Sequence, residues 1–355
     1  GQLQIDADNV NAGSQGLGLM AGTIYANRIY LVGGAWTAVT TTNPGDTAPC
    51  ANKTTSPTVT NNANRKETIY AMIDDSNNIV DPDTGSSSGV WKFSVALMDP
   101  VRRRAVSFGY NGYIYSLAGY SGTESLQDLL FTKIDVSTGD LSPWDSSGVV
   151  VTPRWDLRAV VSNGYVYAIG GCGAGAAPNA CSDMQEQIQT FQLYNNDSGA
   201  PVGFTASANQ FATDRLGASS VIYDGYLYVA GGCTSTTDCT DATNSVQYAA
   251  IDDYGNLGTW NTGGNLPADR TWGQLEVAGG TLYYIGGQGD SSTDERAEVY
   301  YTTSISTGNP TWSGTAASNG LPAARTQHGA TVWNNRIYVT GGNDTSAAAS
   351  ATVYV

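Results

Sequence analysis

The amino-acid sequence predicts an all-β protein, a six-bladed β-propeller of four-stranded antiparallel blades. One short pattern occurs six times: a turn, a run of mostly apolar residues and a glycine pair, as in N-G-Y-V-Y-A-I-G-G at 163–171. In the second copy the pair reads Ala-Gly. The second glycines stand at 34, 119, 171, 232, 287 and 342. A step of about 50 to 60 residues between glycine pairs is typical of propeller blades.

The order of strands within one repeat supports four strands per blade. In the repeat at 225–279, residues 226–230 form a first predicted strand that ends in the glycine pair. Residues 245–251 and 257–260 form two more, joined by the turn D-D-Y-G, which is typical of a hairpin. Residues 271–278 lead into the next copy. Short aromatic and β-branched runs between turn formers are the pattern of strands.

A large aromatic residue recurs on the third strand of the repeats. We expect it to pack between adjacent blades, because such a side chain buries a large apolar area. The residues at this position are Trp91, Trp144, Phe204, Trp260 and Trp312.

The two ends of the chain predict how the ring closes. Residues 351–355 match a second strand, and residues 1–5 match the third strand at 255–259. The first residues should therefore complete the last blade, which removes an exposed edge. This makes residues 1–355 a single domain. The long first step leaves 35–66 as a loop insertion in the first blade, and a hidden seventh repeat is the alternative.

Composition excludes several classes of partner. The net charge is -15 and the pI is near 4.2, so nucleic acid is not expected as a partner, since phosphate binding needs a basic face. No apolar run approaches the roughly 18 residues that cross a bilayer, so no membrane insertion is expected.

The five cysteines predict disulfides and an oxidising compartment. Cys172 with Cys181, and Cys233 with Cys239, each fall in one loop after a glycine pair. A zinc site is the weaker alternative, because the chain has one histidine. Cys50 is left over, either free or available for a cross-link and self-association. We expect a secreted or cell-surface protein; the start at Gly1 without an apolar leader fits a mature product or a trimmed chain.

These motifs together resemble the kelch-type propeller. The motifs are the glycine pair after a strand, the aromatic that follows, the late tryptophan, and an arginine thirteen residues before the tyrosine of each copy. Leu17 takes this position in the first repeat. We interpret the arginines as structural, binding loop carbonyls or a carboxylate and tying blade to blade; an anion-binding ring is the alternative. The structural arginines are Arg102, Arg154, Arg215, Arg270 and Arg325.

The resemblance also implies where a ligand would bind. In kelch propellers with known ligands, binding residues often lie two places after the arginine and just after the glycine pair. These positions vary from blade to blade here, as on a binding face, although drifting surface loops vary too. The ligand-binding residues predicted in this way are Arg104, Asp156, Trp272, Gln327, Tyr120, Gln288, Asn343 and Trp36.

The function predicted is a non-catalytic, extracellular or surface-displayed binding module that recognises a glycan or a protein through the propeller rim. One alternative is a carbohydrate-active enzyme of the sialidase or sugar-epimerase kind. Another is a structural subunit of a surface appendage.

Catalysis is the less favoured hypothesis, and no catalytic residue is assigned. A copper site like that of galactose oxidase needs two histidines, and the chain has only His328, which we interpret as structural. No carboxylate pair has a recognisable glycosidase spacing. No metal site or cofactor is predicted; calcium stays open only at the acidic loops 81–85 and 290–295, neither of which has the twelve-residue calcium-loop spacing.

Overall fold

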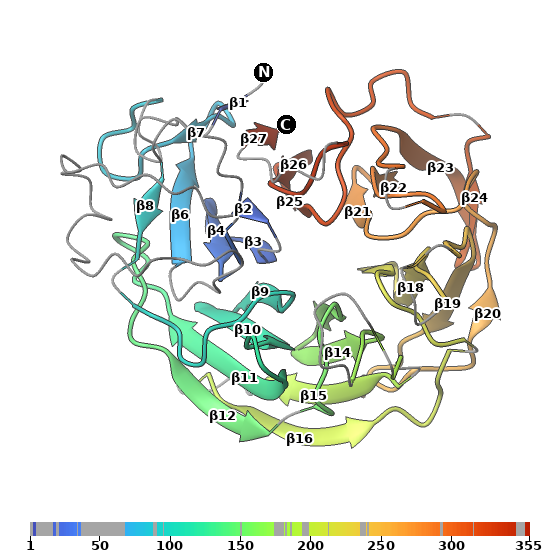
Figure 1. Ribbon diagram of the computed structural model, residues 1–355, viewed down its shortest axis with the longest axis horizontal. Helices are drawn as coiled ribbons and strands as arrows, with labels where there is room; N and C mark the ends of the chain where they lie inside the picture. The colour runs from blue at the N-terminus through green and yellow to red at the C-terminus, as the bar shows by residue number, and fades with distance from the viewer. Residues whose placement is uncertain are drawn as a thin grey trace.

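Six antiparallel sheets stand around a central axis in the computed structural model, as the ribbon shows (Figure 1). The structure describes residues 3–4, 17–18, 21–33, 35–36, 68–87, 91–94, 96–149, 151–173, 181, 183–184, 187–193, 199–211, 213–234, 239, 241–291, 294–314, 316–345 and 352–355. These residues form strands, bridges and turns and no helix. The predicted fold, an all-β six-bladed propeller, is confirmed.

Each blade runs from an inner strand near the axis to an outer strand at the circumference. Blade 1 holds β3 (Ala21–Tyr25), β4 (Arg28–Val32), β6 (Thr68–Ile73), β7 (Ile79–Val80) and β8 (Lys92–Phe93). Blade 2 holds β9 (Val106–Tyr110), β10 (Tyr113–Tyr120), β11 (Ser125–Lys133) and β12 (Asp145–Val149). Blade 3 holds β13 (Arg158–Ser162), β14 (Tyr165–Ile169), β15 (Gln189–Leu193) and β16 (Pro201–Ala206).

The second half of the ring repeats this order. Blade 4 holds β17 (Ser219–Tyr223), β18 (Tyr226–Ala230), β19 (Val246–Ala250) and β20 (Asn261–Thr262). Blade 5 holds β21 (Gln274–Ala278), β22 (Thr281–Ile285), β23 (Val299–Ser306) and β24 (Asn309–Trp312). Blade 6 holds β25 (Gly329–Trp333), β26 (Arg336–Thr340), β27 (Thr352–Tyr354) and β1 (Leu3–Gln4).

The two ends of the chain meet in blade 6, as predicted. Strand β1 pairs antiparallel with β27, and the register places Leu3 opposite Val353 and Gln4 opposite Thr352. Three strands of this blade therefore come from the C-terminal end of the chain and one comes from the N-terminal end. The closing strand covers the edge that β27 would otherwise expose.

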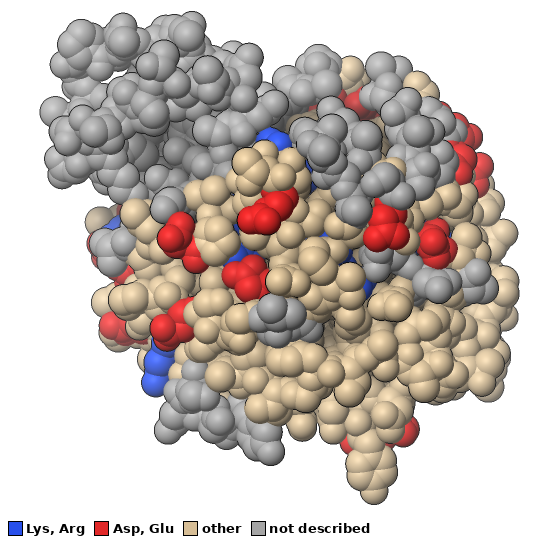
Figure 2. All heavy atoms as spheres, turned by 60° about the horizontal axis from the view of Figure 1, so that its bottom comes forward, with Lys and Arg blue, Asp and Glu red and all other residues tan. Residues whose placement is uncertain are grey.

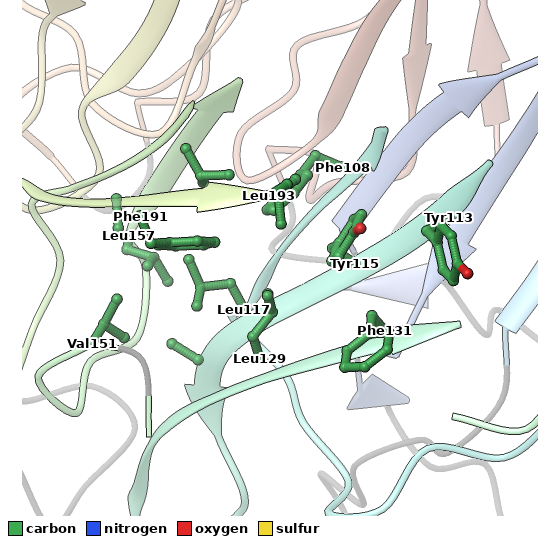
Figure 3. Packing of buried hydrophobic residues seen from close by; sticks show 13 residues of the cluster. Phe108, Tyr113, Tyr115, Leu117, Leu129, Phe131, Val151, Leu157, Phe191 and Leu193 are labelled. Carbon is green, nitrogen blue, oxygen red and sulfur yellow. The ribbon is translucent and has the colours of Figure 1, made fainter. Parts of the chain in front are cut away.

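Among the described residues, each pair of neighbouring blades encloses one apolar cluster, and these six clusters make up most of the core. The cluster between blades 2 and 3 packs Leu117 and Leu129 against Phe191 and Leu193 (Figure 3). The recurring tryptophans lie in this kind of contact, so the prediction that they pack between blades is confirmed for four of them. They are Trp91, Trp144, Trp260 and Trp312. Phe204 instead contacts Phe191 in its own blade, with ring centroids 5.3 Å apart.

Tyrosines of the repeated pattern tie four of the blades to the next one, through Tyr30, Tyr115, Tyr167 and Tyr338. The hydroxyl of Tyr30 donates to the Gly139 carbonyl of blade 2 over 3.0 Å. Tyr167 does the same to Gly255 of blade 4 over 2.9 Å. In blade 4 the Tyr228 ring is buried in the same way, but its hydroxyl has no hydrogen-bond partner among the described residues.

One detail departs from the predicted elements, and another lies mostly outside the described residues. The third strand expected at 257–260 is an isolated pair between Ile251 and Leu257, followed by β20 at Asn261–Thr262. The predicted insertion at 35–66 lies outside the described residues apart from β5 (Ala35–Trp36), which pairs with β2 (Leu17–Gly18). Cys50 also lies outside them. Among the described residues, no helix is long and apolar enough to cross a membrane.

Candidate functional site

The two sets of predicted binding positions lie side by side on one face of the ring, here called the rim face. It is the face where the second strand of each blade ends in its glycine pair. One set lies two places after the repeated arginine position, and the other lies just after the glycine pair. In every blade, the residue directly before a member of the first set forms a backbone pair with the residue that follows the glycine pair. These pairs are Gly18 with Ala35, Arg103 with Tyr120, Trp155 with Cys172, Leu216 with Cys233, Thr271 with Gln288, and Thr326 with Asn343.

The five repeated arginines are buried beneath this face. In blade 3, the Nη1 atom of Arg154 donates to the carbonyl oxygens of Gly170 and Gln187 over 3.1 and 2.9 Å. In blade 4, Arg215 binds Gly231 and Ser245 in the same way. Burial lowers the pKa of both arginines to about 10. Their guanidinium groups hold together strands of their own blade, and they do not face a ligand.

Arginines of the last two blades use an aromatic partner. Arg270 donates to the hydroxyl of Tyr300 over 2.7 Å and lies 5.1 Å from the centre of its ring. Arg325 has the same relation to Tyr354, at 2.8 and 5.2 Å. Such a cation over an aromatic face is stabilising when it is desolvated.

The ties between blades that we expected from these arginines come from their backbone. The amide of Gly171, at the end of blade 3, donates to the Arg215 carbonyl of blade 4 over 3.1 Å. Gly119 makes the equivalent bond to Arg154 over 2.9 Å. The glycine is required here, because Gly171 has a φ of 94° and a Cβ would lie 2.8 Å from the Trp155 carbonyl oxygen.

A ring of left-handed residues follows the arginines. Arg104, Asp156, Trp272 and Gln327 have φ values of 54°, 52°, 51° and 53°, and Gly217 takes the same conformation at 65°. Their backbones also bond from blade to blade: the Asp156 amide donates to the Arg104 carbonyl over 2.9 Å, and the Gln327 amide donates to the Trp272 carbonyl over 3.0 Å. Four of the eight predicted ligand-binding residues thus stand in one unusual backbone state.

Two side chains of this ring contact each other, and two members contact neighbouring residues of the rim face. Arg104 and Asp156 form an ion pair, with 2.7 Å between Nη1 and Oδ2. The Arg104 guanidinium also lies 4.8 Å from the ring centre of Trp155. In blade 6, the Asn343 side-chain amide donates to Gln327 Oε1 over 3.3 Å.

Burial divides the predicted ligand-binding residues into two groups. Tyr120 is 2% exposed and Gln288 is 4% exposed, so neither presents its side chain to a ligand in this conformation. Trp36 lies in β5, and its side chain is outside the described part of the structure. The remainder is partly exposed and is here called the accessible rim set: Arg104, Asp156, Trp272, Gln327 and Asn343. Within it, the side chains of Arg104 and Asp156 are 10% and 13% exposed.

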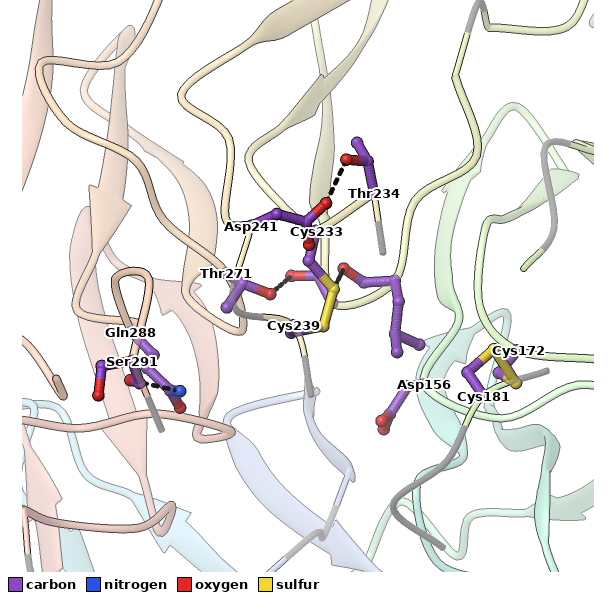
Figure 4. Close-up of a disulfide and its surroundings, with 12 residues drawn as sticks. Asp156, Cys172, Cys181, Cys233, Thr234, Cys239, Asp241, Thr271, Gln288 and Ser291 are labelled. Atoms are coloured by element: carbon purple, nitrogen blue, oxygen red, sulfur yellow. Dashed lines mark hydrogen bonds between the residues drawn. A yellow bond between two sulfur atoms is a disulfide. The ribbon is translucent and has the colours of Figure 1, made fainter. Parts of the chain in front are cut away.

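Both predicted disulfides are confirmed. Cys172 bonds to Cys181 with 5.6 Å between Cα atoms, and Cys233 bonds to Cys239 with 5.1 Å. Figure 4 shows Asp156 lying between the two bonds. The sequence did not reveal that both disulfides join one apolar cluster of the rim face, because its members come from different blades. Its buried members are Tyr120, Trp155, Cys172, Cys181, Leu216, Cys233 and Cys239.

A second polar group, which sequence reasoning missed, surrounds the propeller axis. The inner strands enclose a cavity of about 220 Å³, and Arg158, Glu276 and His328 are among its lining residues. A signal was present in the sequence: four residues after the repeated arginine, Arg158 stands where the other repeats have uncharged residues. His328 is 2% exposed, and burial lowers its pKa to about 3, so its imidazole is neutral.

The described residues contain no group of three or more His, Cys, Asp or Glu side chains arranged to hold a metal ion. In one acidic loop considered for calcium, Asp81 accepts hydrogen bonds from the backbone amides of Asp83 and Thr84 over 2.9 and 2.8 Å. The Asp81 carboxylate therefore stabilises its own turn. Acidic side chains elsewhere are spread over the surface with few basic neighbours, as Figure 2 shows for one face.

Comparisons with known proteins agree with this architecture. No protein-family model matches the chain. Two curated relatives, both called Kelch repeat and BTB domain-containing protein 1, come from vaccinia virus (strain Copenhagen) and cowpox virus (strain GRI-90 / Grishak). Each is 22% identical over 211 residues, which cover 59% of this chain and 33% of the relative. This chain therefore spans about a third of the length of the curated relatives that it matches.

A solved structure shows the same fold over nearly the whole chain. The structure of YjhT covers 95% of this chain and 94% of its own, with a TM-score of 0.63 and 14% identity. The ring of six four-stranded blades and the weak sequence similarity together support a kelch-type β-propeller. That fold and that similarity fit a binding module in general.

Proposed function

We propose that this chain is a binding module that recognises a protein or a glycan through the accessible rim set, outside the cell or at its surface. The observation that carries the proposal is the left-handed backbone of Arg104, Asp156, Trp272 and Gln327. A residue with a side chain costs about 1–2 kcal/mol in this state. Gly217 shows that glycine fits the same place. A role for these side chains, rather than for the turn, would explain why glycine is absent at four of the five positions.

The chemistry of the accessible rim set suits a polar ligand. The Arg104–Asp156 pair offers charged donors and acceptors, and the Gln327–Asn343 pair offers amides. Trp272 lies between them in the order of the blades and is half-buried, so it can contribute an aromatic surface. Kelch propellers generally bind protein partners, which supports a protein ligand. Amides beside an aromatic ring support a glycan.

The two disulfides support the proposed location. Structural disulfides persist in oxidising compartments and are rare in the cytosol. Both bonds here are buried in the rim cluster rather than exposed for redox exchange. This favours a structural role in a secreted or surface-displayed protein.

The test uses glycine itself as the substitution. Gln327→Gly removes a side chain but suits the local φ, so the melting temperature should hold or rise slightly. Trp272→Gly also suits the local φ but loses packing against the rim cluster, so its melting temperature should fall. Capture of ligand, measured on a glycan array and by cross-linking in the native extracellular fraction, should fall about tenfold. Asn335→Gly is the matched control, since Asn335 also has a left-handed backbone, with φ 60°, and is exposed in the β25–β26 turn.

Unchanged capture in both rim variants, or no capture by the parent protein on either platform, would overturn the proposal. The two alternatives from the sequence predict other results in the same samples. A carbohydrate-active enzyme would convert a sugar that it binds, and Asp156→Asn should reduce the turnover. A structural subunit would form covalent assemblies on non-reducing gels that Cys50→Ser abolishes.

A further inference from the structure

The cavity on the propeller axis is lined by the inner strands of all six blades. Most of its lining is small or apolar, including Ala21, Ala105, Ala159 and Ala330. Among the described residues, three charged or titratable side chains line it: Arg158 from blade 3, Glu276 from blade 5 and His328 from blade 6. A cavity of about 220 Å³ is smaller than sites for drug-sized ligands. It would hold a molecule of a few heavy atoms.

Arg158 crosses this cavity between blades. Its Nε atom donates to the Ala218 carbonyl of blade 4 over 2.9 Å. Its Nη2 atom makes a longer bond, 3.4 Å, to the Gly273 carbonyl of blade 5. These neutral carbonyl oxygens hold the guanidinium group in place, but they do not neutralise its positive charge. Within the described ranges, no carboxylate forms an ion pair with Arg158.

Some other polar side chains at the cavity make no hydrogen bond of normal geometry within the described residues. Within the described part of the chain, neither ring nitrogen of His328 makes a hydrogen bond of normal geometry. The buried hydroxyl of Ser220, in the lining of blade 4, also has no partner. An unsatisfied buried polar group costs about 1–3 kcal/mol. Such groups beside an uncompensated cation indicate a place that a polar molecule fills.

Glu276 adds a donor when it is protonated. Burial raises its pKa to about 8, although the Arg158 charge opposes this shift. At neutral pH Glu276 is therefore an uncharged carboxylic acid in most molecules, and its O–H group can donate a hydrogen bond to a ligand oxygen. The cavity then carries the single positive charge of Arg158. One cation beside one neutral acid donor matches a ligand with a single negative charge. A doubly charged phosphate would match less well, because one of its two negative charges would not be neutralised.

We propose that this axial cavity is a second ligand site, separate from the rim face, that binds a small monocarboxylate between the Arg158 guanidinium and the Glu276 carboxyl group. The guanidinium donates to one carboxylate oxygen and the Glu276 acid donates to the other. The Ser220 hydroxyl supplies a further donor within the same lining. The alanines and Val160 accommodate a short carbon chain.

The surrounding groups decide how the site responds to pH. Burial lowers the pKa of Arg158, and the nearby Asp156 carboxylate opposes this shift. The guanidinium group is so strongly basic that it still carries its charge in this range. His328 stays neutral above its lowered pKa, and burial raises the pKa of Tyr284, behind the inner strand, to about 12. The linings from β3, β9 and β17 add no titratable side chain. Only Glu276 therefore changes charge between pH 7 and 9, and its ionised form repels a carboxylate.

The experiment follows trifluoroacetate by fluorine NMR, with acetate and lactate as competitors and chloride at matched ionic strength. In the parent protein, saturable line broadening at pH 7 should weaken about tenfold by pH 9, as the protonated fraction of Glu276 falls. Glu276→Gln keeps a neutral donor at every pH, so its binding should stay the same from pH 7 to 9. Arg158→Gln should lose binding at least tenfold, while Arg336→Gln, on the exposed start of β26, should not change it.

Circular dichroism checks that each variant folds. If Arg158→Gln does not fold, the pH profile of Glu276→Gln still decides the matter. Absence of saturable binding in the parent protein would overturn the proposal. So would a fall with pH that is equal in Glu276→Gln and the parent, or binding that Gln327→Gly removes, since that would place the anion on the rim face.

Discussion

Two sectors of the rim face use the same backbone with different side chains. In blades 3 and 4, the residue after the glycine pair is a disulfide cysteine, Cys172 or Cys233, inside a buried apolar cluster. In blades 5 and 6 the same position holds Gln288 and Asn343, whose amides donate hydrogen bonds to nearby loop residues. The backbone pair at this position is the same in all four blades. The repeat thus determines the backbone conformation. The side chains find different partners in the two sectors, an apolar disulfide cluster in one and hydrogen bonds to nearby loop residues in the other.

The buried arginines follow the same division. Arg154, in the disulfide sector, donates mainly to backbone carbonyls of its own blade and to the Gln189 side chain. Arg325, in the amide sector, donates to its neighbour's carbonyl and to the Tyr354 hydroxyl, and lies over that ring. Removal of Arg154 leaves several buried carbonyls without a donor, whereas removal of Arg325 leaves an aromatic ring that still packs. The two losses should therefore differ in size.

The largest expected effect is on the arginine of the disulfide sector. Arg154→Met should lower the free energy of unfolding by about 3–5 kcal/mol, because it strands buried carbonyl groups. Arg325→Met should lower it by about 1–3 kcal/mol, since the methionine can still contact Tyr354. Urea unfolding followed by tryptophan fluorescence measures both. Equal losses would contradict the division into sectors.

The repeat explains how much of this fold could be predicted from the sequence. A position that recurs from blade to blade is visible several times, so the six glycine pairs, the six tyrosines and the five buried arginines could be placed by counting. The ring closure followed because the two ends supply complementary parts of one repeat. The tryptophan contacts between blades followed from the same regularity, with Phe204 as the exception.

The candidate site was less predictable, because it depends on contacts between blades. Tyr120 matched the binding pattern, yet it is buried with cysteines from two other blades. The cavity brings together Arg158 and Glu276, which are 118 positions apart and deviate from the repeat in single blades only. Counting within a repeat reveals shared positions. It does not reveal which deviations meet in space.

An intermediate effect is expected from the disulfides. The bonds close loops of 9 and 6 residues in sequence separation. Such short loops constrain the unfolded chain only modestly, so Cys233→Ala with Cys239→Ala should lower the free energy of unfolding by about 2 kcal/mol. Hydrogen exchange should rise in the rim loops of blades 3 and 4. If it rises equally around Gln288 and Asn343, the sectors do not behave separately.

The smallest expected effect comes from the cavity where the two sectors meet, with Arg158 on one side and Glu276 and His328 on the other. The folded-state pKa of Glu276, about 8, lies above its ordinary value of 4.5, so the folded state holds a proton that the unfolded state has lost. Stability should fall as pH rises between these values. His328 acts oppositely: its folded-state pKa of about 3 lies below 6.5, so stability falls as pH drops from 6.5 toward 3.

The two contributions oppose each other between pH 4.5 and 6.5, and only Glu276 acts above that window. The parent protein should therefore lose about 1 kcal/mol of unfolding free energy between pH 7 and 8, and Glu276→Gln should lose correspondingly less. His328→Gln should instead reduce the loss of unfolding free energy below pH 6.5 and leave the alkaline side unchanged. Urea unfolding at steps of half a pH unit measures the free energy of unfolding on both the acid and the alkaline side. A decline above pH 7 that persists in Glu276→Gln would assign it to another group and would remove the acid donor that the monocarboxylate site requires.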